Sequence, residues 1–283
     1  MKIDAHHHFW NPNERDYYWM GGEELASIRR PIGPDDMAPL LDKAGIGGTV
    51  LVQTIPSLDE TRDFLRVAAE VPFVKGVVGW VDLTDPNVGD TIAALQAGPG
   101  GAFLKGIRHQ AHDEDDKGWM ARADVIEGVR ACGAAGLVQD LLPKEPELPA
   151  CITCVDALPD VTFVVDHIAK PRIADGAMEP WLDRITEIAK RPNVYCKLSG
   201  MVTEADWTGW SVDDLRRYAD HVLALFGPDR VIFGSDWPVC LLAAEYADVV
   251  GAAESLIAGL TEDQKRAVQG GNAARVYGLD LGA

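Results

Sequence analysis

The amino-acid sequence predicts an α/β fold of the (β/α)8 TIM-barrel type. Eight short apolar runs are spread along the chain, amphipathic helical patterns separate them, and 283 residues are enough for one such barrel. An open doubly wound sheet is the alternative, but no Gly-rich phosphate-binding turn follows the first run. We therefore expect a single domain spanning residues 1–283.

The eight runs have the composition of buried parallel strands. Each holds four to eight residues, rich in β-branched or apolar side chains, which is too short for a helix. Successive runs begin about 25 to 45 residues apart, which leaves room for one helix and two loops. The expected strands are residues 2–5, 48–53, 74–81, 103–107, 136–140, 162–165, 193–197 and 230–233.

Helical patterns fill the gaps between these runs. Residues 35–44 place apolar side chains on one face at the i, i+3, i+4, i+7 spacing. Ser57 and Glu60 form the sequence of a capping box, which predicts that a helix begins there. Further helices are expected at residues 147–158, 180–189, 212–226 and 261–276, the last of them interrupted by Gly270 and Gly271.

The longest connection follows the first strand, over residues 12–34, and carries an aromatic stretch at residues 17–20. A loop of this length in a compact domain usually has a function of its own. We therefore expect residues 17–20 to line or cover a site.

Composition and charge exclude several classes of partner. With 26 Lys and Arg against 44 Asp and Glu, the formal net charge is −18, which disfavours nucleic acid and anionic membrane surfaces. No apolar run approaches the roughly 20 residues of a membrane helix, and the first residues lack the apolar stretch of a signal peptide. The sequence therefore predicts a cytoplasmic protein that acts on a small molecule. The sequence does not decide whether the protein forms a homo-oligomer.

The cysteines agree with a reducing compartment. There are five, an odd number at irregular spacing, which does not suggest a disulfide framework. Cys151 and Cys154 form a C-x-x-C pair, but no second Cys or His pair follows, and the pair falls inside a predicted helix. We expect two small residues on a packed helix face.

Polar residues gather where the predicted strands end. In a barrel of this kind, catalytic side chains lie at the carboxyl ends of the strands. Six of the seven histidines occupy such positions. In chain order, the strand-end residues are His6, His7 and His8; Gln53; Trp80 and Asp82; Arg108, His109 and His112; Asp140; Asp166 and His167; Lys197 and Ser199; and Asp236 and Trp237.

Two of these groups suggest chemistry by themselves. His6 and His8 are two apart on a strand, so both side chains project from one face and could hold a metal or bind an oxyanion. Asp236 ends an apolar strand, where a carboxylate is costly unless it has a partner. The alternative for Asp236 is a cap on a helix that Pro238 could begin.

With these residues in view, the chain resembles the amidohydrolase superfamily, and within it the amidohydrolase-2 branch of lactone hydrolases, whose members open sugar lactones such as L-fuconolactone and L-rhamnonolactone. The motifs that carry the resemblance extend from residue 3 to residue 275. They are residues 3–10, 106–110, 165–171, 196–200, 234–238 and 271–275.

The resemblance implies at most one metal ion. Binuclear members of the superfamily supply a histidine from the fifth strand, and here that strand reads Leu137-Val138-Gln139-Asp140. The remaining set could hold one divalent ion, such as zinc, with three nitrogens and a carboxylate. The resemblance also implies that lactonases of this branch can work without metal. The candidate ligands are His6, His8, His167 and Asp236.

The expected reaction is hydrolysis of a sugar-acid lactone to the open aldonate. Asp236 would act as general base towards water, and His6, His8 and His167 would polarise the carbonyl. The remaining candidates would bind and orient the substrate: Arg108, His109, His112, Trp80, Trp237 and Lys197.

Three alternatives stay open. A pyrone-dicarboxylate lactone hydrolase of the same branch should need several arginines, but only Arg108 and Arg172 lie near strand ends in a chain of net charge −18. A zinc-dependent decarboxylase of the branch would require metal and an aromatic acid. A non-catalytic barrel that binds a carbohydrate would leave the histidines and Asp236 without a chemical role.

Overall fold

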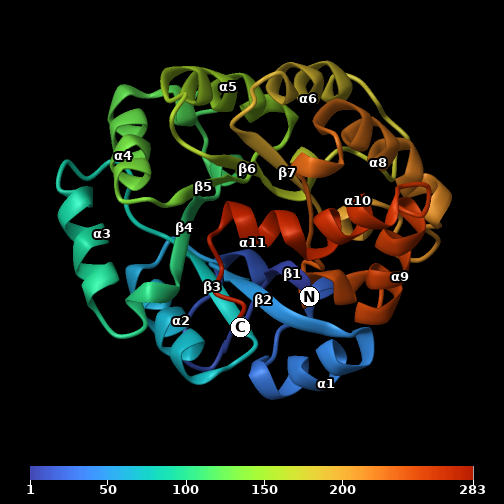
Figure 1. The fold of residues 1–283 in the computed structure, drawn as a ribbon, viewed down its shortest axis with the longest axis horizontal. Helices are drawn as coiled ribbons and strands as arrows, with labels where there is room; N and C mark the ends of the chain where they lie inside the picture. The colour runs from blue at the N-terminus through green and yellow to red at the C-terminus, as the bar shows by residue number, and fades with distance from the viewer. Residues whose placement is uncertain (283) are drawn as a thin grey trace.

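A computed structural model, which describes residues 1–282, shows eight parallel strands that follow one another around a barrel in chain order (Figure 1). A parallel bridge between His7 and Trp237 joins the first strand to the segment after the last. The predicted barrel fold is confirmed. The strands are β1 (Lys2–His7), β2 (Ile46–Val52), β3 (Val74–Gly79), β4 (Leu104–His109), β5 (Val138–Leu141), β6 (Phe163–Val165), β7 (Val194–Leu198) and β8 (Val231–Phe233).

Helices form the outer ring, and those predicted from the sequence are present. Ser57 Oγ accepts a hydrogen bond from Glu60 N, as the capping sequence predicts, and Ser211 caps a later helix in the same way. The helices are α1 (Pro34–Ala44), α2 (Leu58–Glu70), α3 (Val88–Ala97), α4 (Ala123–Ala134), α5 (Leu148–Ala157), α6 (Trp181–Ala189), α7 (Met201–Glu204), α8 (Val212–Phe226), α9 (Tyr246–Leu256), α10 (Glu262–Arg266) and α11 (Asn272–Val276).

The last predicted helix is divided into α10 and α11 by a turn at Ala267–Gly271. A Cβ atom on Gly270 would lie 2.4 Å from the backbone oxygen of Met1, so only glycine fits this close approach. The two helices therefore pack directly against the start of the chain.

The end of the barrel near the N-terminus is covered by α10 and α11 (Figure 1). The side-chain amide of Asn272 donates hydrogen bonds to the backbone oxygens of Pro228 and Val231, where β8 begins. The hydroxyl of Tyr277, just after α11, reaches Asp140 inside the barrel at 2.9 Å. Access to the barrel is therefore from the opposite end, where the strands terminate.

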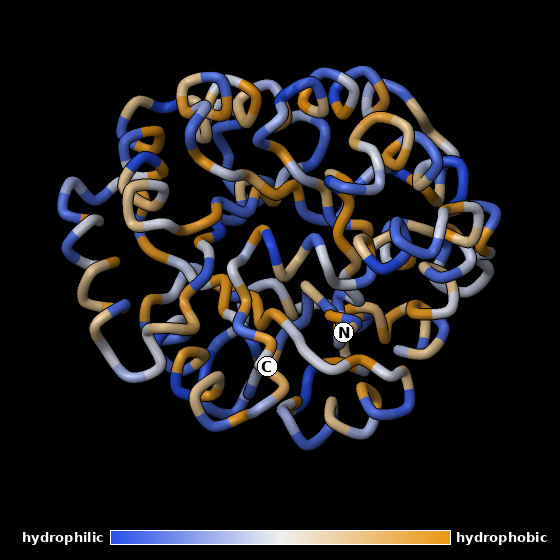
Figure 2. Tube along the Cα trace, viewed as in Figure 1, coloured by the Kyte–Doolittle hydropathy of each residue, from blue (hydrophilic) through white to orange (hydrophobic). Residues whose placement is uncertain are grey.

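Apolar side chains fill two regions. One lies between the strands and the surrounding helices. The other fills the end of the barrel interior that α11 covers, with small β-branched residues such as Val50, Val78 and Val164. Figure 2 shows long hydrophobic stretches along the central strands and alternating hydropathy around the outer helices. This is the pattern of a sheet buried on both faces.

Among residues 1–282, no helix has the combination of length and apolar character needed to cross a bilayer. All five cysteines are buried, and none forms a disulfide. Cys151 and Cys154 lie on the inner face of α5, fully buried, as expected for small residues in a packed helix.

Candidate active site

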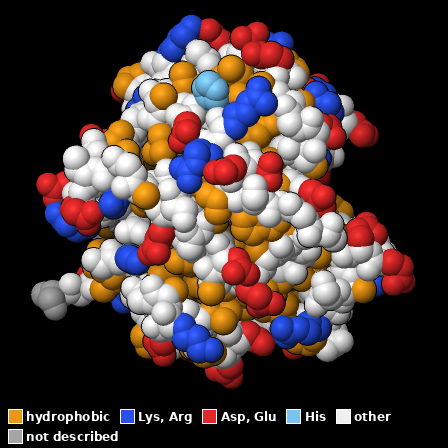
Figure 3. Space-filling model, turned by 90° about the vertical axis from the view of Figure 1, so that its right-hand side faces the viewer, with side chains coloured by type: hydrophobic (Ala, Val, Ile, Leu, Met, Phe, Trp, Pro, Cys, Tyr) orange, Lys and Arg blue, Asp and Glu red, His pale blue; other side chains and the backbone are white. Residues whose placement is uncertain are grey.

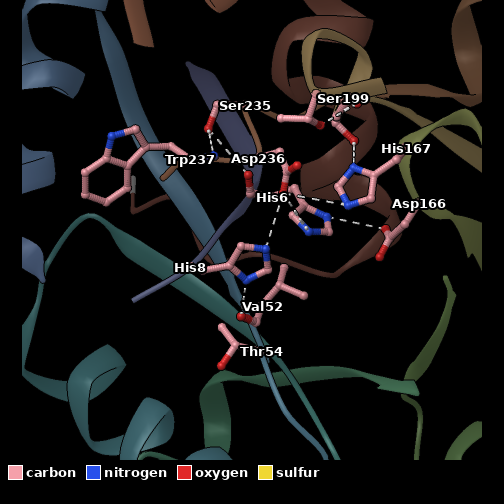
Figure 4. A network of polar contacts seen from close by, with 12 residues as sticks. His6, His8, Val52, Thr54, Asp166, His167, Ser199, Ser235, Asp236 and Trp237 are labelled. Carbon is pink, nitrogen blue, oxygen red and sulfur yellow. Dashed lines mark hydrogen bonds and ion pairs between the residues drawn. The ribbon is translucent and has the colours of Figure 1, made fainter. Parts of the chain in front are cut away.

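Four side chains from three strand ends meet at the open end of the barrel (Figure 4). The Oδ1 atom of Asp236 lies 3.9 Å from His6 Nε2, 3.4 Å from His8 Nε2 and 3.7 Å from His167 Nε2. None of the four residues is more than 4% exposed. Their predicted convergence is confirmed.

The alternation of side chains along β1 decides which histidines take part. His6 and His8 face the barrel axis, and His7, between them, faces outwards. The Nε2 atom of His7 contacts Thr49 Oγ1 at 2.9 Å, and its ring packs against Phe9. His7 is therefore part of the packing between the barrel wall and its surroundings.

Unusual backbone conformations bring His167 and Asp236 into place. Asp236 has a φ of 59°, and His167 and the three residues after it have φ values between 48° and 60°. Residues other than glycine rarely adopt this left-handed backbone conformation, and those that do are concentrated at functional sites. Gly200 also has a positive φ, and a Cβ there would lie 2.5 Å from His167 Nδ1. The glycine leaves room for the imidazole.

Each histidine of the cluster has a partner on its second nitrogen. His8 Nδ1 contacts the backbone oxygen of Val52 at 2.7 Å, and His167 Nδ1 contacts Ser199 Oγ at 2.9 Å. His6 Nδ1 lies 3.4 Å from Asp166 Oδ1. Contacts of this kind orient metal-binding histidines in proteins.

Burial keeps two of these imidazoles neutral. Desolvation lowers the pKa of His6 well below its usual value, and the neighbouring cations Lys197 and Arg108 lower it further. The pKa of His167 is likewise well below its usual value, first because of burial and then because of His6. Neither ring supplies a positive charge at neutral pH.

A buried charge network lies directly beneath the histidines. Lys197 Nζ lies 2.6 Å from Asp140 and 2.9 Å from Asp166, and Arg108 Nη1 lies 3.0 Å from Asp166. Burial raises the pKa of Asp140 to about 6, against the opposing effect of Lys197. Burial also acts to raise the pKa of Asp166, but Lys197 and Arg108 outweigh it and hold that pKa below its usual value. The network pairs two cations with two carboxylates.

The cluster opens into a cavity of about 160 Å³. The aromatic stretch predicted to cover a site does reach it, because Trp19 forms part of the wall, and the Tyr18 hydroxyl donates to Asp113 nearby at 2.8 Å. Larger hollows lie elsewhere, for instance between α2 and α3, but histidines do not line that one. The cavity is lined by His8, Trp19, Thr54, Arg108, Gln110, His112, Asp113, Leu142, His167, Lys170, Asp236 and Val239.

Several predicted substrate-binding residues are not brought to this cavity. His109 follows the inward-facing Arg108 and so points outwards, where its ring stacks on Trp119 at 3.9 Å and its Nδ1 accepts a hydrogen bond from Trp80. Trp237, one residue after Asp236, is 2% exposed and points away from the cluster (Figure 4).

Lys197 is also absent from the cavity wall. It is fully buried and held between two carboxylates below the histidines, so it is placed to stabilise the network and not to contact a substrate. Of the predicted substrate-binding residues, Arg108 and His112 are those that line the cavity.

Thr54 and Gln110 also line the cavity, and neither is among the residues predicted from the sequence to bind substrate. The alternation that turns His109 outwards returns Gln110 to the side of Arg108, and this signal was available in the sequence. Thr54 directly follows Gln53 after β2, and its backbone N–H donates to Glu60 at 2.8 Å. That buried partner comes from α2 and could not be read from the strand itself.

Fold and site together define a barrel with a histidine and aspartate cluster at its strand ends. The chain belongs to the amidohydrolase family, whose model matches residues 3–279. An L-fucono-1,5-lactonase from Burkholderia ambifaria is 38% identical over 287 residues, which cover 99% of this chain and 96% of that protein. An L-fucono-1,5-lactonase from Burkholderia multivorans is also 38% identical, over 291 residues and with the same coverage of both chains.

Solved structures agree with this assignment. Crystal structures of an amidohydrolase from Burkholderia multivorans, one with bound HEPES and one with bound zinc, match this chain with a TM-score of 0.93 at 36% identity. The match covers 99% of this chain and 100% of the other.

Proposed function

We propose that the protein hydrolyses the lactone of a sugar acid, of the L-fucono-1,5-lactone class, to the open aldonate. The observation that carries the proposal is the position of Asp236, with its carboxylate at the centre of three histidines and at the wall of a cavity of about 160 Å³. Support also comes from the two L-fucono-1,5-lactonases that are 38% identical over nearly the whole chain.

In this mechanism Asp236 removes a proton from a water molecule as the water oxygen attacks the lactone carbonyl carbon. The carbonyl oxygen becomes an oxyanion in the tetrahedral intermediate. The bond to the ring oxygen then breaks, and the ring oxygen takes up the proton held by Asp236 and becomes a hydroxyl group. The product is a single open-chain molecule, the aldonic acid, which carries the freed hydroxyl group and whose carboxylic acid ionises.

Arg108 is the residue best placed to stabilise the oxyanion. Arg108 lines the cavity, its guanidinium carries a positive charge and is fixed by Asp166, and His6 and His167 are neutral. We therefore assign to Arg108 the polarising role that the sequence interpretation gave to the histidines. The histidines would position Asp236 and the attacking water.

The remaining wall suits a neutral hydroxylated ring. Trp19 offers a flat apolar surface, and His112, whose Nδ1 contacts the backbone oxygen of Leu142, offers a polar edge. The two basic side chains of the wall already have carboxylate partners, Arg108 with Asp166 and Lys170 with Glu204. A dicarboxylated pyrone lactone would need more cations than these two side chains, so the wall favours a sugar lactone.

The donor set fits one divalent metal ion. Ligand atoms of His6, His167 and Asp236 lie within 4.8 Å of one another, and the second nitrogens of both imidazoles face fixed partners. His8 belongs to the expected set through its 3.4 Å approach to Asp236. A bound metal such as zinc would supply a Lewis acid at the carbonyl oxygen. The zinc-bound structure of the Burkholderia multivorans relative supports this assignment.

We also propose that the enzyme works in the cytoplasm, in carbohydrate metabolism. Five buried cysteines without a disulfide are typical of proteins from reducing compartments. The place in carbohydrate metabolism follows from the proposed substrate, because a sugar lactone is a carbohydrate derivative.

A substrate panel tests the proposal. Purified protein, both stripped of metal and loaded with zinc, would be assayed with five- and six-carbon sugar lactones, a pyrone dicarboxylate lactone and an aromatic acid, together with analysis of bound metal. We expect turnover of the sugar lactones. Exclusive turnover of the pyrone dicarboxylate, or decarboxylation of the aromatic acid that is lost on removal of metal, would replace the proposed function with one of the alternatives.

A further inference from the structure

His6 is held between two cations. Arg108 Nη1 lies 3.2 Å from His6 Nε2, on the side of the metal-ligand cluster, and Lys197 Nζ lies 3.2 Å from His6 Nδ1. The Arg108 guanidinium is also fixed by Asp166 and by the backbone oxygen of Gln53. It is 2% exposed, so its position is set by these partners.

A neutral imidazole carries a single lone pair in its ring plane, on the nitrogen without a proton, and a metal ion needs that lone pair. If the proton of His6 is on Nδ1, facing Asp166, the lone pair of Nε2 is taken by the N–H of Arg108. If the proton is on Nε2, this atom has no lone pair, and the Nδ1 lone pair faces Lys197. In neither tautomer is Nε2 free to bind a metal.

Electrostatic repulsion also opposes metal binding at His6 while the guanidinium is beside it. A divalent ion on His6 Nε2 would lie beside the guanidinium, and two neighbouring positive charges in a buried site disfavour each other. Two of the other candidate ligands, His167 and Asp236, have no such contact, because no cation is within hydrogen-bond distance of His167 Nε2 or of the Asp236 carboxylate among the described residues.

We propose that Arg108 and a divalent metal ion are mutually exclusive partners of His6, so that a metal binds at His6, His167 and Asp236 only when the guanidinium leaves His6 Nε2. The site then has two forms: in the first the guanidinium occupies His6 Nε2, and in the second the metal does. Arg108 sets the metal affinity of the protein. This inference concerns metal binding alone and does not depend on which substrate is hydrolysed.

Zinc affinity of the metal-stripped protein, measured by competition with a chelating dye, tests the proposal. The Arg108→Gln variant removes the guanidinium from His6, and we expect it to bind zinc at least about 10-fold more tightly than the wild type. Lys170→Gln is the matched control, because Lys170 is a basic residue of the same cavity wall but pairs with Glu204. Its zinc affinity should stay within about 3-fold of the wild type.

Equal affinities of the wild type and Arg108→Gln, or equal tightening in Arg108→Gln and Lys170→Gln, would overturn the proposal, as would the absence of zinc binding in all three proteins. Removing Arg108 takes a partner from the buried Asp166 and could prevent folding, so a crystal structure of the zinc-loaded wild type provides a second test. We expect Arg108 Nη1 to lie beyond hydrogen-bond distance of His6 Nε2 in that structure. Zinc on His6 with the guanidinium still at about its present 3.2 Å would refute mutual exclusion.

Discussion

Asp236 and His167 both lie in the left-handed region of backbone conformation, which costs about 1–3 kcal/mol for a residue other than glycine. The surrounding contacts offset this cost. Asp236 N donates to the backbone oxygen of His6 at 2.8 Å, and the carboxylate of Asp4 accepts from both the backbone N–H and the hydroxyl of Ser235. The loop after β8 is thus fastened to β1, and Asp236 is held facing the histidines before any substrate binds.

The Asp236→Asn variant tests the general base. Asparagine has almost the same shape and tolerates positive φ, so the fold should survive, but the amide cannot accept the proton of the attacking water. We expect kcat to fall by at least about 10²-fold with KM little changed. If Asp236 were only a helix cap, kcat would hold and the melting temperature would change little, because asparagine caps nearly as well. Measuring both quantities separates the two roles.

Gly200→Ala tests the space left for His167. The new Cβ would lie 2.5 Å from His167 Nδ1 and would push the imidazole away from Asp236. We expect kcat to fall about 10-fold or more, because small displacements of catalytic groups are costly. Gly45→Ala is the control, since Gly45 has a similar φ of 66° but no atom within 4 Å of the added Cβ. It should lose stability and keep its activity. Equal activity in the two variants would show that the contact with His167 does not matter.

Much of the site could be predicted at the residue scale, because the position of a strand end and the alternation of side chains are both visible in the sequence. His6, His8 and Asp236 follow from this reasoning. His109 also follows from it: a residue next to the inward-facing Arg108 points outwards, so its place at a strand end does not bring it to the site. The left-handed turn that carries His167 could not be predicted, because no glycine marks it.

At the scale of elements, the connection between β1 and α1 forms part of the cavity wall. Trp19 lines the cavity, and its ring packs edge-to-face on Trp10 at 5.4 Å. The neighbouring Tyr18 hydroxyl bonds to Asp113, in the segment after β4, and ties this connection to the opposite wall. A loop predicted from its length and aromatic content thus has a defined place in the cavity wall.

Trp19→Ala should raise KM for a sugar lactone about 10-fold and leave kcat within about 3-fold of the wild type, because we expect the indole to contact the sugar ring and not the reacting atoms. Steady-state kinetics on one lactone measure both constants. Tyr18→Phe is the companion variant, since it removes only the hydrogen bond of an exposed side chain to Asp113. It should change KM by no more than about 2-fold. A fall in kcat without a change in KM in Trp19→Ala would contradict the assigned role.

The boundary of β7 decides the position of Lys197. The sequence predicts that the seventh strand ends at residue 197, which puts Lys197 at the strand end, but β7 continues to Leu198 and Lys197 lies inside the barrel. Ser199, just beyond the strand, is the residue that reaches His167. An error of one residue in a strand boundary thus moves a side chain from the site to the network beneath it, and boundaries are the least certain part of a sequence prediction.

At the scale of the whole molecule, the charges on the surface are exposed to solvent, whereas the ionisable groups in the interior are either paired or kept neutral. The formal net charge is −18, and acidic and basic side chains are interspersed on the surface over α8, α9 and α10 (Figure 3). Inside the barrel, Lys197 and Arg108 pair with Asp140 and Asp166. Burial keeps His6 and His167 neutral inside the barrel and His7 neutral outside its wall. Stability should therefore depend on pH through groups that the solvent does not reach.

His7 provides a clean test of this dependence because it lies outside the site and contacts no carboxylate among the described residues. Burial lowers its pKa well below the usual value in the folded protein, and the unfolded chain has a pKa of about 6.5. Above that pH both states are neutral and the full stability is present. As the pH falls below it, the unfolded state binds a proton that the folded state cannot, so stability is lost by about 1.4 kcal/mol per pH unit until the folded pKa is reached.

The His7→Gln variant lacks this titration. We expect the unfolding free energy of the wild type, relative to the variant, to fall by about 1.4 kcal/mol for each pH unit below about 6.5. Urea unfolding of the metal-stripped proteins between about pH 7.5 and 5 measures the difference. The fixed cost of losing the contact with Thr49 cancels, because it is the same at every pH. A difference that stays constant over this range would mean that His7 accepts a proton in the folded protein as readily as in the unfolded chain, and that burial does not control its charge.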